Sequence, residues 1–142
     1  MRLDQTLVDT ALALAAARWP GREAGAAALY TASGRILTSV FAESPNQSAS
    51  LCHETGAICE AHKLQENVTA CVCVSRKDAD STFVILPPCG ICCERLAFWG
   101  GDVQLAVPNP DDPTQWQMKR LKQLLPHYWL NTWLAETPVG LF

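Results

Sequence analysis

The chain has 142 residues, of which 49% are hydrophobic and 18% charged, and its formal net charge is −3. This length and composition predict one globular domain over residues 1–142 with its own apolar core, and they exclude a disordered chain. The acidic balance argues against a nucleic-acid polymer as partner, because binding phosphates takes a surplus of Lys and Arg. A small-molecule ligand is favoured instead.

Helix and strand patterns alternate along the first half of the chain. Apolar residues at helical spacing, stopped by Trp19-Pro20-Gly21, indicate a first helix, and two short β-rich runs around Ser33-Gly34 indicate a hairpin. The elements expected here are a helix over 4–18, strands over 26–31 and 35–41, a polar loop over 43–50 and a helix over 51–66.

The second half continues the alternation. The elements expected here are strands over 68–75, 83–86 and 103–107 and helices over 89–99 and 114–125, followed by an aromatic tail. Residues 68–75 are apolar on both faces, which is typical of a central strand covered by helices. The order of elements predicts an α/β fold, a three-layer α/β/α sandwich with one mixed central sheet of about five strands.

The seven cysteines are odd in number and lie in apolar segments and in a Cys-x-x-Cys cluster, which argues against a secreted disulfide framework. Free thiols and a metal site are the better interpretation. The N-terminal residues lack the pattern of a signal peptide, and no apolar run reaches the roughly 18 residues of a membrane span. We therefore expect a cytoplasmic protein with no membrane partner.

Two segments carry metal-binding chemistry: Cys52-His53-Glu54 and Pro88-Cys89-Gly90-Ile91-Cys92. Each cysteine segment opens a predicted helix, where unpaired backbone N–H groups and the helix dipole favour a thiolate. Cys52, Cys89 and Cys92 would fill three corners of a zinc tetrahedron and leave the fourth for water, as in catalytic zinc sites. Glu54, two residues after the first ligand, could reach that water.

The alternatives are a closed structural zinc site, with His53 as fourth ligand, and a redox cysteine pair. Adjacent helical residues point about 100° apart, so His53 and Cys52 would not easily converge on one metal. The spacing of Glu54 from Cys52 also favours catalysis. The other cysteines are expected to be small buried hydrophobes and two histidines to lie on the surface: Cys59, Cys71, Cys73 and Cys93, and His62 and His127.

A ligand-x-Glu followed by Pro-Cys-x-x-Cys is the pattern of zinc deaminases. The chain resembles the short, all-cysteine branch of the cytidine deaminase family, which includes the blasticidin S deaminases. The resemblance extends to residues 26–35, to Asn67-Val68-Thr69, and to Leu124-Leu125-Pro126 with Tyr128 and Trp129. It implies a zinc-dependent hydrolytic deaminase of cytidine or a cytosine-nucleoside analogue, acting in pyrimidine salvage, and a homo-oligomer with a tetramer favoured.

The resemblance also implies roles for single residues. Glu54 would be the acid/base that carries protons between water, the ring N3 and the leaving ammonia. Glu43, nine residues before the first ligand, would bind a sugar hydroxyl of the substrate. The family often carries Arg directly after the catalytic Glu and directly after the last ligand, where this chain has Thr55 and Cys93; Arg95 is the candidate substitute.

The substrate side departs from the family. Phe41 stands where the family has an Asn beside the sugar, and the family's base-stacking Phe falls at Glu23 or Ala24. Trp19 could compensate for the missing ring. We therefore expect plain cytidine to be a weak substrate compared with an altered cytosine nucleoside. The alternatives are a blasticidin S-type antibiotic deaminase and a catalytically silent, zinc-stabilised interaction module.

Overall fold

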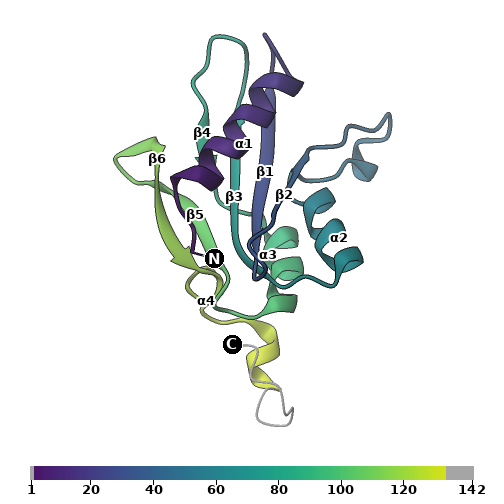
Figure 1. The fold of residues 1–142 in the computed structure, drawn as a ribbon, viewed down its shortest axis with the longest axis vertical. Coiled ribbons are helices and arrows are strands. Elements are labelled where there is room, and N and C mark those ends of the chain that lie inside the picture. The colour runs from purple at the N-terminus through teal and green to yellow at the C-terminus, as the bar shows by residue number, and fades with distance from the viewer. Residues whose placement is uncertain (1, 134–142) are drawn as a thin grey trace.

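The computed structural model describes residues 2–133, and its elements surround one six-stranded sheet (Figure 1). The helices and strands are α1 (Gln5–Arg18), β1 (Ala24–Thr31), β2 (Ile36–Val40), α2 (Thr55–Leu64), β3 (Val68–Arg76), β4 (Val84–Leu86), α3 (Gly90–Leu96), β5 (Gln104–Asn109), β6 (Asp112–Arg120) and α4 (Leu121–Leu124). Three short 3-10 helices lie between or after these elements, at Gln47–Ala49, Ala97–Trp99 and Trp129–Thr132. The strand order is β2-β1-β3-β5-β6, and β4 also pairs with β3.

The sheet is mixed, as the sequence predicted. β1 pairs antiparallel with β2 and with β3, while β5 pairs parallel with β3 at Ala70 and Cys71. The β1–β2 hairpin turns at Gly34, whose φ of 89° lies in the region that suits glycine. The central position of β3 explains why its sequence is apolar on both faces.

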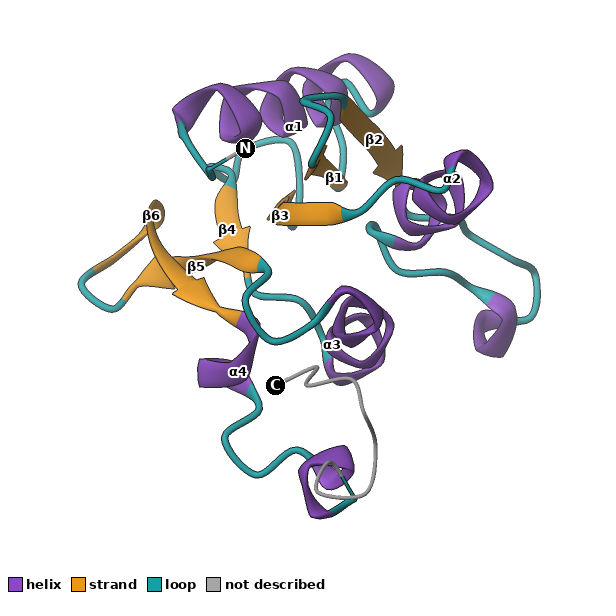
Figure 2. Ribbon diagram, turned by 60° about the horizontal axis from the view of Figure 1, so that its bottom comes forward, coloured by secondary structure: helices purple, strands orange, loops and turns teal. Residues whose placement is uncertain are grey.

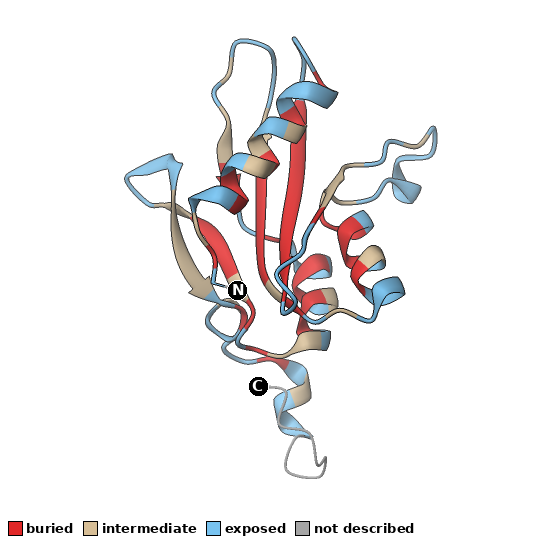
Figure 3. Ribbon diagram, viewed as in Figure 1, coloured by how far each residue is buried: buried red, intermediate tan, exposed pale blue. Residues whose placement is uncertain are grey.

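The sheet has a helix layer on each face (Figure 2). Alternate residues of β1 face opposite ways, so Ala26 and Ala28 pack in one core cluster with α1, whereas Ala27 and Leu29 pack in the other with α2 and α3. Both clusters are closed to solvent, and β1 is buried along its whole length (Figure 3). The predicted three-layer sandwich is therefore confirmed.

The predicted helix over 114–125 is wrong for most of its length. Residues of β6 pair antiparallel with β5, from Asp112 opposite Asn109 to Arg120 opposite Gln104, and only α4 is helical. Gln, Met, Lys and Arg are good helix formers, but pairing with the open edge of β5 overrides that weak preference. Trp116 and Met118, two residues apart, pack on the α1 side of the sheet, which is a strand pattern.

The two cysteine segments sit differently at their helix starts. Cys89 is the N-cap of α3, as predicted. Cys52, however, lies ahead of α2, in a turn closed by a hydrogen bond from the Thr55 N–H to the Cys52 carbonyl at 3.1 Å, and Glu54 is the N-cap residue. The expected helix from residue 51 therefore begins at Thr55.

None of the helices in residues 2–133 is long and apolar enough to cross a membrane. All of the sheet and both helix layers fall within these residues. The aromatic tail beyond residue 133 lies outside them, so one domain over 1–142 stays a prediction.

Candidate metal centre and active site

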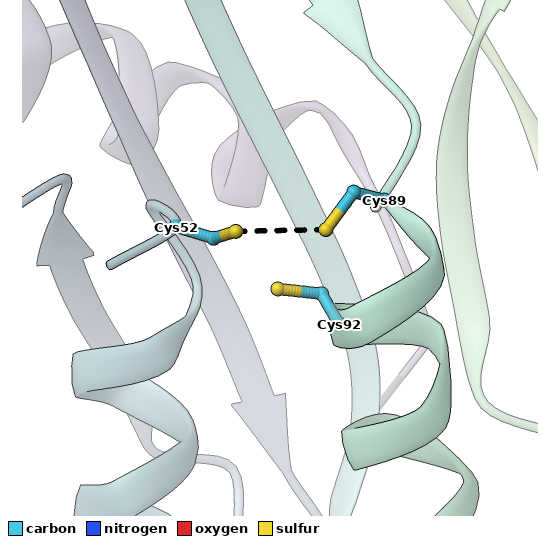
Figure 4. Close-up of side chains that lie close together, drawn as sticks. All are labelled: Cys52, Cys89 and Cys92. Atoms are coloured by element: carbon cyan, nitrogen blue, oxygen red, sulfur yellow. Dashed lines mark hydrogen bonds between the residues drawn. The ribbon is translucent and has the colours of Figure 1, made fainter. Parts of the chain in front are cut away.

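The three cysteine sulfurs meet where the turn before α2 approaches the start of α3. Cys52 comes from that turn, Cys89 from the N-cap of α3 and Cys92 from its first turn. The side chains point toward a common space (Figure 4), and all three sulfurs lie within 4.8 Å of one another. The Sγ atoms of Cys52 and Cys89 are 3.5 Å apart. The structure therefore brings together the three predicted ligands.

Glu54 is the carboxylate next to this cluster. It is only 3% exposed, and its Oε2 accepts a hydrogen bond from the Cys92 thiol at 3.3 Å. A buried carboxylate needs such a partner, because burial of an unpaired charge is costly. The acid/base candidate and the three sulfur donors thus form one compact group.

The surroundings of the three thiols shift their pKa values in different directions. Burial raises the pKa of Cys92, and the charge of Glu54 and its hydrogen bond raise it further. Burial also raises the pKa of Cys52, together with its hydrogen bond to Cys89. For Cys89, burial acts in the same direction, but hydrogen bonds to its sulfur from the Cys92 and Ile91 N–H groups and the Cys52 thiol outweigh it and lower the pKa. Cys89 is therefore the sulfur best prepared to become a thiolate.

The donor set fits zinc. Three thiolates bonded to zinc at about 2.3 Å in a tetrahedral arrangement have sulfurs about 3.8 Å apart, close to the spacing of Cys52 and Cys89. Sulfur ligands select zinc over hard cations such as Mg²⁺. Among the described residues His53 is not in this group, but shares a second one with Glu54 and Cys73. His53 therefore does not complete a four-ligand structural site.

Arg95 connects the two ligand segments. Its Nη1 donates to the Thr55 Oγ1 at 2.7 Å, across from α3 to the first residue of α2. This contact places the guanidinium beside the residue that follows Glu54. Arg95 thus braces the site, and its role in balancing thiolate charge stays a prediction.

The expected substrate residues lie at the end of β2 and in the loop that follows. Phe41 is half-buried, and its ring stacks on Trp19 with centroids 4.7 Å apart and planes 7° apart. Glu43 is exposed and paired with Arg22 at 3.1 Å. It lines a hollow of about 640 Å³ together with Ser44, Pro45, Gln47 and Ser50. The ring of Trp19 therefore reaches Phe41, whereas Glu23 is exposed and Ala24 is buried in β1.

The remaining cysteines and aromatic residues have other surroundings. Cys71, Cys73 and Cys93 are buried as expected, but Cys59 is exposed, so the expectation for Cys59 is wrong. His62 and His127 are exposed, as expected. Tyr128 and Trp129 donate to the Glu94 carboxylate on α3 at 2.9 and 3.1 Å. The closing aromatics therefore contact the outside of the ligand helix.

Sequence reasoning missed three residues near the site. It weighed His53 only as a metal ligand, and it gave Gly25 and Arg22 no role. Gly25 is buried inside β1, where an interior glycine is unusual and often marks close approach of another group. That signal was present in the run Ala24–Thr31. The pairing of Arg22 with Glu43 depends on the tertiary fold and left no local signal.

The chain is similar in structure to solved cytidine deaminases. The chain is 42% identical to the cytidine deaminase from Bacillus anthracis, over 93% of each chain, with a TM-score of 0.86. It is 27% identical to the enzyme from Mycobacterium tuberculosis, over 90% of this chain and 98% of that one, with a TM-score of 0.66. For the Mycobacterium leprae enzyme the identity is 25%, over 87% and 97%, with a TM-score of 0.65. No family model and no curated protein sequence matches the chain.

Fold and cluster together define an α/β enzyme of the nucleoside deaminase class. The chain belongs to the cytidine deaminase family.

Proposed function

We propose that this protein is a zinc-dependent hydrolytic deaminase that converts cytidine or a cytosine-nucleoside analogue to the corresponding uracil compound with release of ammonia. One observation carries the proposal. Three thiols that fit a zinc site lie within 4.8 Å of one another, and the buried Glu54 carboxylate contacts one of them. A purely structural site has no use for a buried acid/base beside three ligands.

Cys52, Cys89 and Cys92 would hold the zinc as thiolates. When bound, zinc supplies a Lewis acid that makes water a nucleophile near neutral pH. Loss of the Cys92 proton also removes the hydrogen bond that Cys92 donates to Glu54. The Glu54 carboxylate is then available for another proton, which is what a general base needs.

Glu54 would move the protons. It would take one proton from the attacking water and deliver it to the ring N3. It would then take a second proton from the hydroxyl that the water has become on the ring carbon, and deliver it to the amine, which leaves as ammonia while the carbonyl forms. Its burial excludes bulk water from these transfers and strengthens its electrostatic interactions with the reacting ring. Arg95, bonded to Thr55, would hold the start of α2 in register with α3.

Glu43 and Phe41 would border the sugar. Glu43 would bind a sugar hydroxyl, although Arg22 already pairs with one of its oxygens. Phe41 offers no hydrogen-bonding group, and its ring is held between Trp19 and His53. These contacts support a preference for a cytosine nucleoside altered on the base or sugar over plain cytidine.

The second candidate is a blasticidin S-type antibiotic deaminase. Arg22 places a cation beside the proposed sugar-binding carboxylate of Glu43. This part of the site therefore presents a positive and a negative charge to a substrate. An aminoacyl nucleoside with charged groups suits such a surface better than a plain ribose does. The catalytically silent module is disfavoured, because Glu54 is retained next to the ligand cluster.

The experiment is ammonia release measured under one set of conditions with cytidine, deoxycytidine, ring-substituted cytidines, cytidine monophosphate, cytosine and blasticidin S. We expect a cytosine nucleoside other than cytidine to have the highest kcat/KM. If cytidine is best, with kcat/KM above roughly 10⁵ M⁻¹s⁻¹, our reading of the sugar side is wrong. If none of the compounds releases ammonia, the proposed function is wrong.

We also propose a homo-oligomer, with a tetramer favoured. Ile91 and Phe98 on the α3 side are 60% and 63% exposed, and such apolar groups are typical of surfaces that a partner covers. The thiols are all free, which suits the reducing cytoplasm that we propose as location. Light scattering should give the mass of a tetramer; a monomer at micromolar concentration would contradict this assignment.

A further inference from the structure

In the sequence, His53 lies between a proposed metal ligand and the proposed acid/base, but it has neither of these two roles. Its side chain points back over the sheet and lies against β1 at Gly25. A Cβ added at Gly25 would overlap the His53 Nε2 and lie 2.5 Å from its Cδ2, far inside van der Waals contact. The backbone of Gly25 has no unusual φ. The absence of a side chain at position 25 therefore makes space for the imidazole.

An aromatic stack also packs against the imidazole. Phe41 meets His53 edge to face, with centroids 5.3 Å apart and planes at 71°, and Trp19 stacks on Phe41. Trp19 is itself buried, so the stack has a fixed base. Edge-to-face and offset-stacked rings are the favoured aromatic geometries.

The main chain of His53 is fixed as well. Its carbonyl accepts a hydrogen bond from the Ser39 hydroxyl on β2. Shortly after β2 ends, Ala42 forms an isolated antiparallel bridge with Leu51, the residue before Cys52. Side chain and backbone of His53 are thus both held by strands that contribute no metal ligand.

We propose that His53 is a positioning residue: wedged between Gly25 and the Phe41–Trp19 stack, it sets the directions of the Cys52 sulfur and the Glu54 carboxylate. The three residues are consecutive, so a rotation of the His53 backbone moves both neighbours. A ring nitrogen of His53 also lies within 4.8 Å of a carboxylate oxygen of Glu54. A misplacement of about 1 Å at a reacting group can cost on the order of 100-fold in rate.

The test is Gly25→Ala, which expels the imidazole, compared with the double variant Gly25→Ala/His53→Ala, in which the two groups no longer collide. We expect Gly25→Ala to lower kcat by about 100-fold and to lower the zinc content, with KM changed only a few-fold. The double variant should recover at least tenfold in kcat. A Cβ at position 25 still lies 3.0 Å from the Val74 carbonyl oxygen, so recovery should be incomplete.

His53→Ala alone supplies the baseline, because it removes the wedge without a collision. We expect it to be less active than wild type, because the wedge is lost, but more active than Gly25→Ala; a wild-type kcat per zinc would overturn the inference. Rates are expressed per bound zinc in folded protein, with melting temperature measured alongside. A purely structural role would lower the melting temperature and leave kcat per zinc unchanged. That result, or Gly25→Ala within twofold of wild type, or a double variant no better than Gly25→Ala, would overturn the inference.

The inference rests on the proposed function only for its kinetic readout. If wild type releases no ammonia from any compound, the proposed function fails by itself. The zinc contents of the three variants then still test the wedge, because Cys52 is one of the residues it orients. A zinc content that is low in Gly25→Ala and higher in the double variant supports the inference. Equal zinc content in all three variants overturns it.

Discussion

The two faces of the sheet use the same central strands for different purposes. On the α1 face, β1 and β3 contribute Ala, Val and Tyr30 to a core that α1 covers with Leu7, Val8 and Ala11. Apart from the bond between the Tyr30 hydroxyl and Asp4 at 3.0 Å, little of this packing is polar. This face contributes stability by burying apolar area.

The α2/α3 face carries the proposed active site. Its core includes Cys71 and Cys73 from β3, and above them lie the ligand cysteines and Glu54. Burial, followed by the charge of Glu54, raises the pKa of the Cys71 and Cys73 thiols well above its ordinary value. Both thiols lie in the buried core and outside the three-sulfur cluster. The comparison shows that β3 supplies an inert floor, whereas the reactive groups come from the turn before α2 and the start of α3.

The largest effect is expected from removing one ligand. Cys89→Ala should abolish stoichiometric zinc and nearly all turnover, because two thiolates cannot replace three. Cys93→Ala is the matched control on the same helix: Cys93 is buried, burial raises its pKa to about 11, and its thiol donates to the Pro88 carbonyl oxygen. Metal analysis should find about one zinc per chain in wild type and in Cys93→Ala. Unchanged zinc in Cys89→Ala would contradict the ligand set.

Glu54→Gln should have the next largest effect. The amide keeps the shape of the side chain but cannot carry a proton, so kcat should fall by about 10²–10⁴-fold. Fold and zinc content should be preserved, since Glu54 is not a ligand in the proposed site. Circular dichroism, metal analysis and ammonia release check the three parts separately. Turnover within about tenfold of wild type would remove Glu54 from its role.

Arg95→Ala tests the brace between the two ligand segments. Loss of its bond to Thr55 should weaken zinc binding or turnover by roughly 10–100-fold, the usual range for partners that orient a metal site. Arg120→Ala is the control, because Arg120 forms a bond of the same 2.7 Å length to Asp102, and neither residue belongs to the cluster. Zinc titration against a chelator measures the affinity. Equal zinc affinities in the two variants would show that Arg95 does not support the zinc site.

A matched pair of core substitutions separates the two faces directly. Leu7 on α1 and Leu96 on α3 are both fully buried, so either change to Ala should cost about 2–5 kcal/mol of unfolding free energy. We expect kcat per zinc to be unchanged in Leu7→Ala and several-fold lower in Leu96→Ala, whose helix carries Cys92. Equal kinetics in the two variants would mean that the faces are not functionally distinct.

The sequence predicted well those parts of the fold that depend on local signals, and poorly those that depend on tertiary contacts. The α1 helix, the first hairpin and β3 were predicted because period and composition are local signals. The convergence of Cys52, Cys89 and Cys92 was predicted from spacing and family resemblance. The β6 strand was not, because pairing with β5 decided its structure against local preference.

The same reason explains what was missed around His53. Its contact with Gly25 joins residues 28 positions apart, and it depends on how the turn before α2 lies over β1. The pairing of Arg22 with Glu43 likewise joins a turn to a loop. Neither partner can be identified by counting along the chain, although the interior glycine of β1 was a usable hint.

Trp19→Phe should have the smallest effect. The Nε1 of Trp19 is buried without a hydrogen-bond partner among the described residues, and an unsatisfied donor of this kind costs about 1–3 kcal/mol. Phenylalanine removes that donor and keeps a ring for Phe41 to stack on, but it has less area and a weaker attraction for the guanidinium of Arg18, 3.9 Å from the indole centroid. These terms oppose one another, so the unfolding free energy should change by less than about 1 kcal/mol and kcat by less than about twofold. Trp19→Ala, by contrast, removes the stack and should lower kcat through His53. Thermal unfolding and ammonia release of both variants measure the difference, and a Trp19→Phe variant as impaired as Trp19→Ala would show that the stack needs the indole itself rather than an aromatic ring.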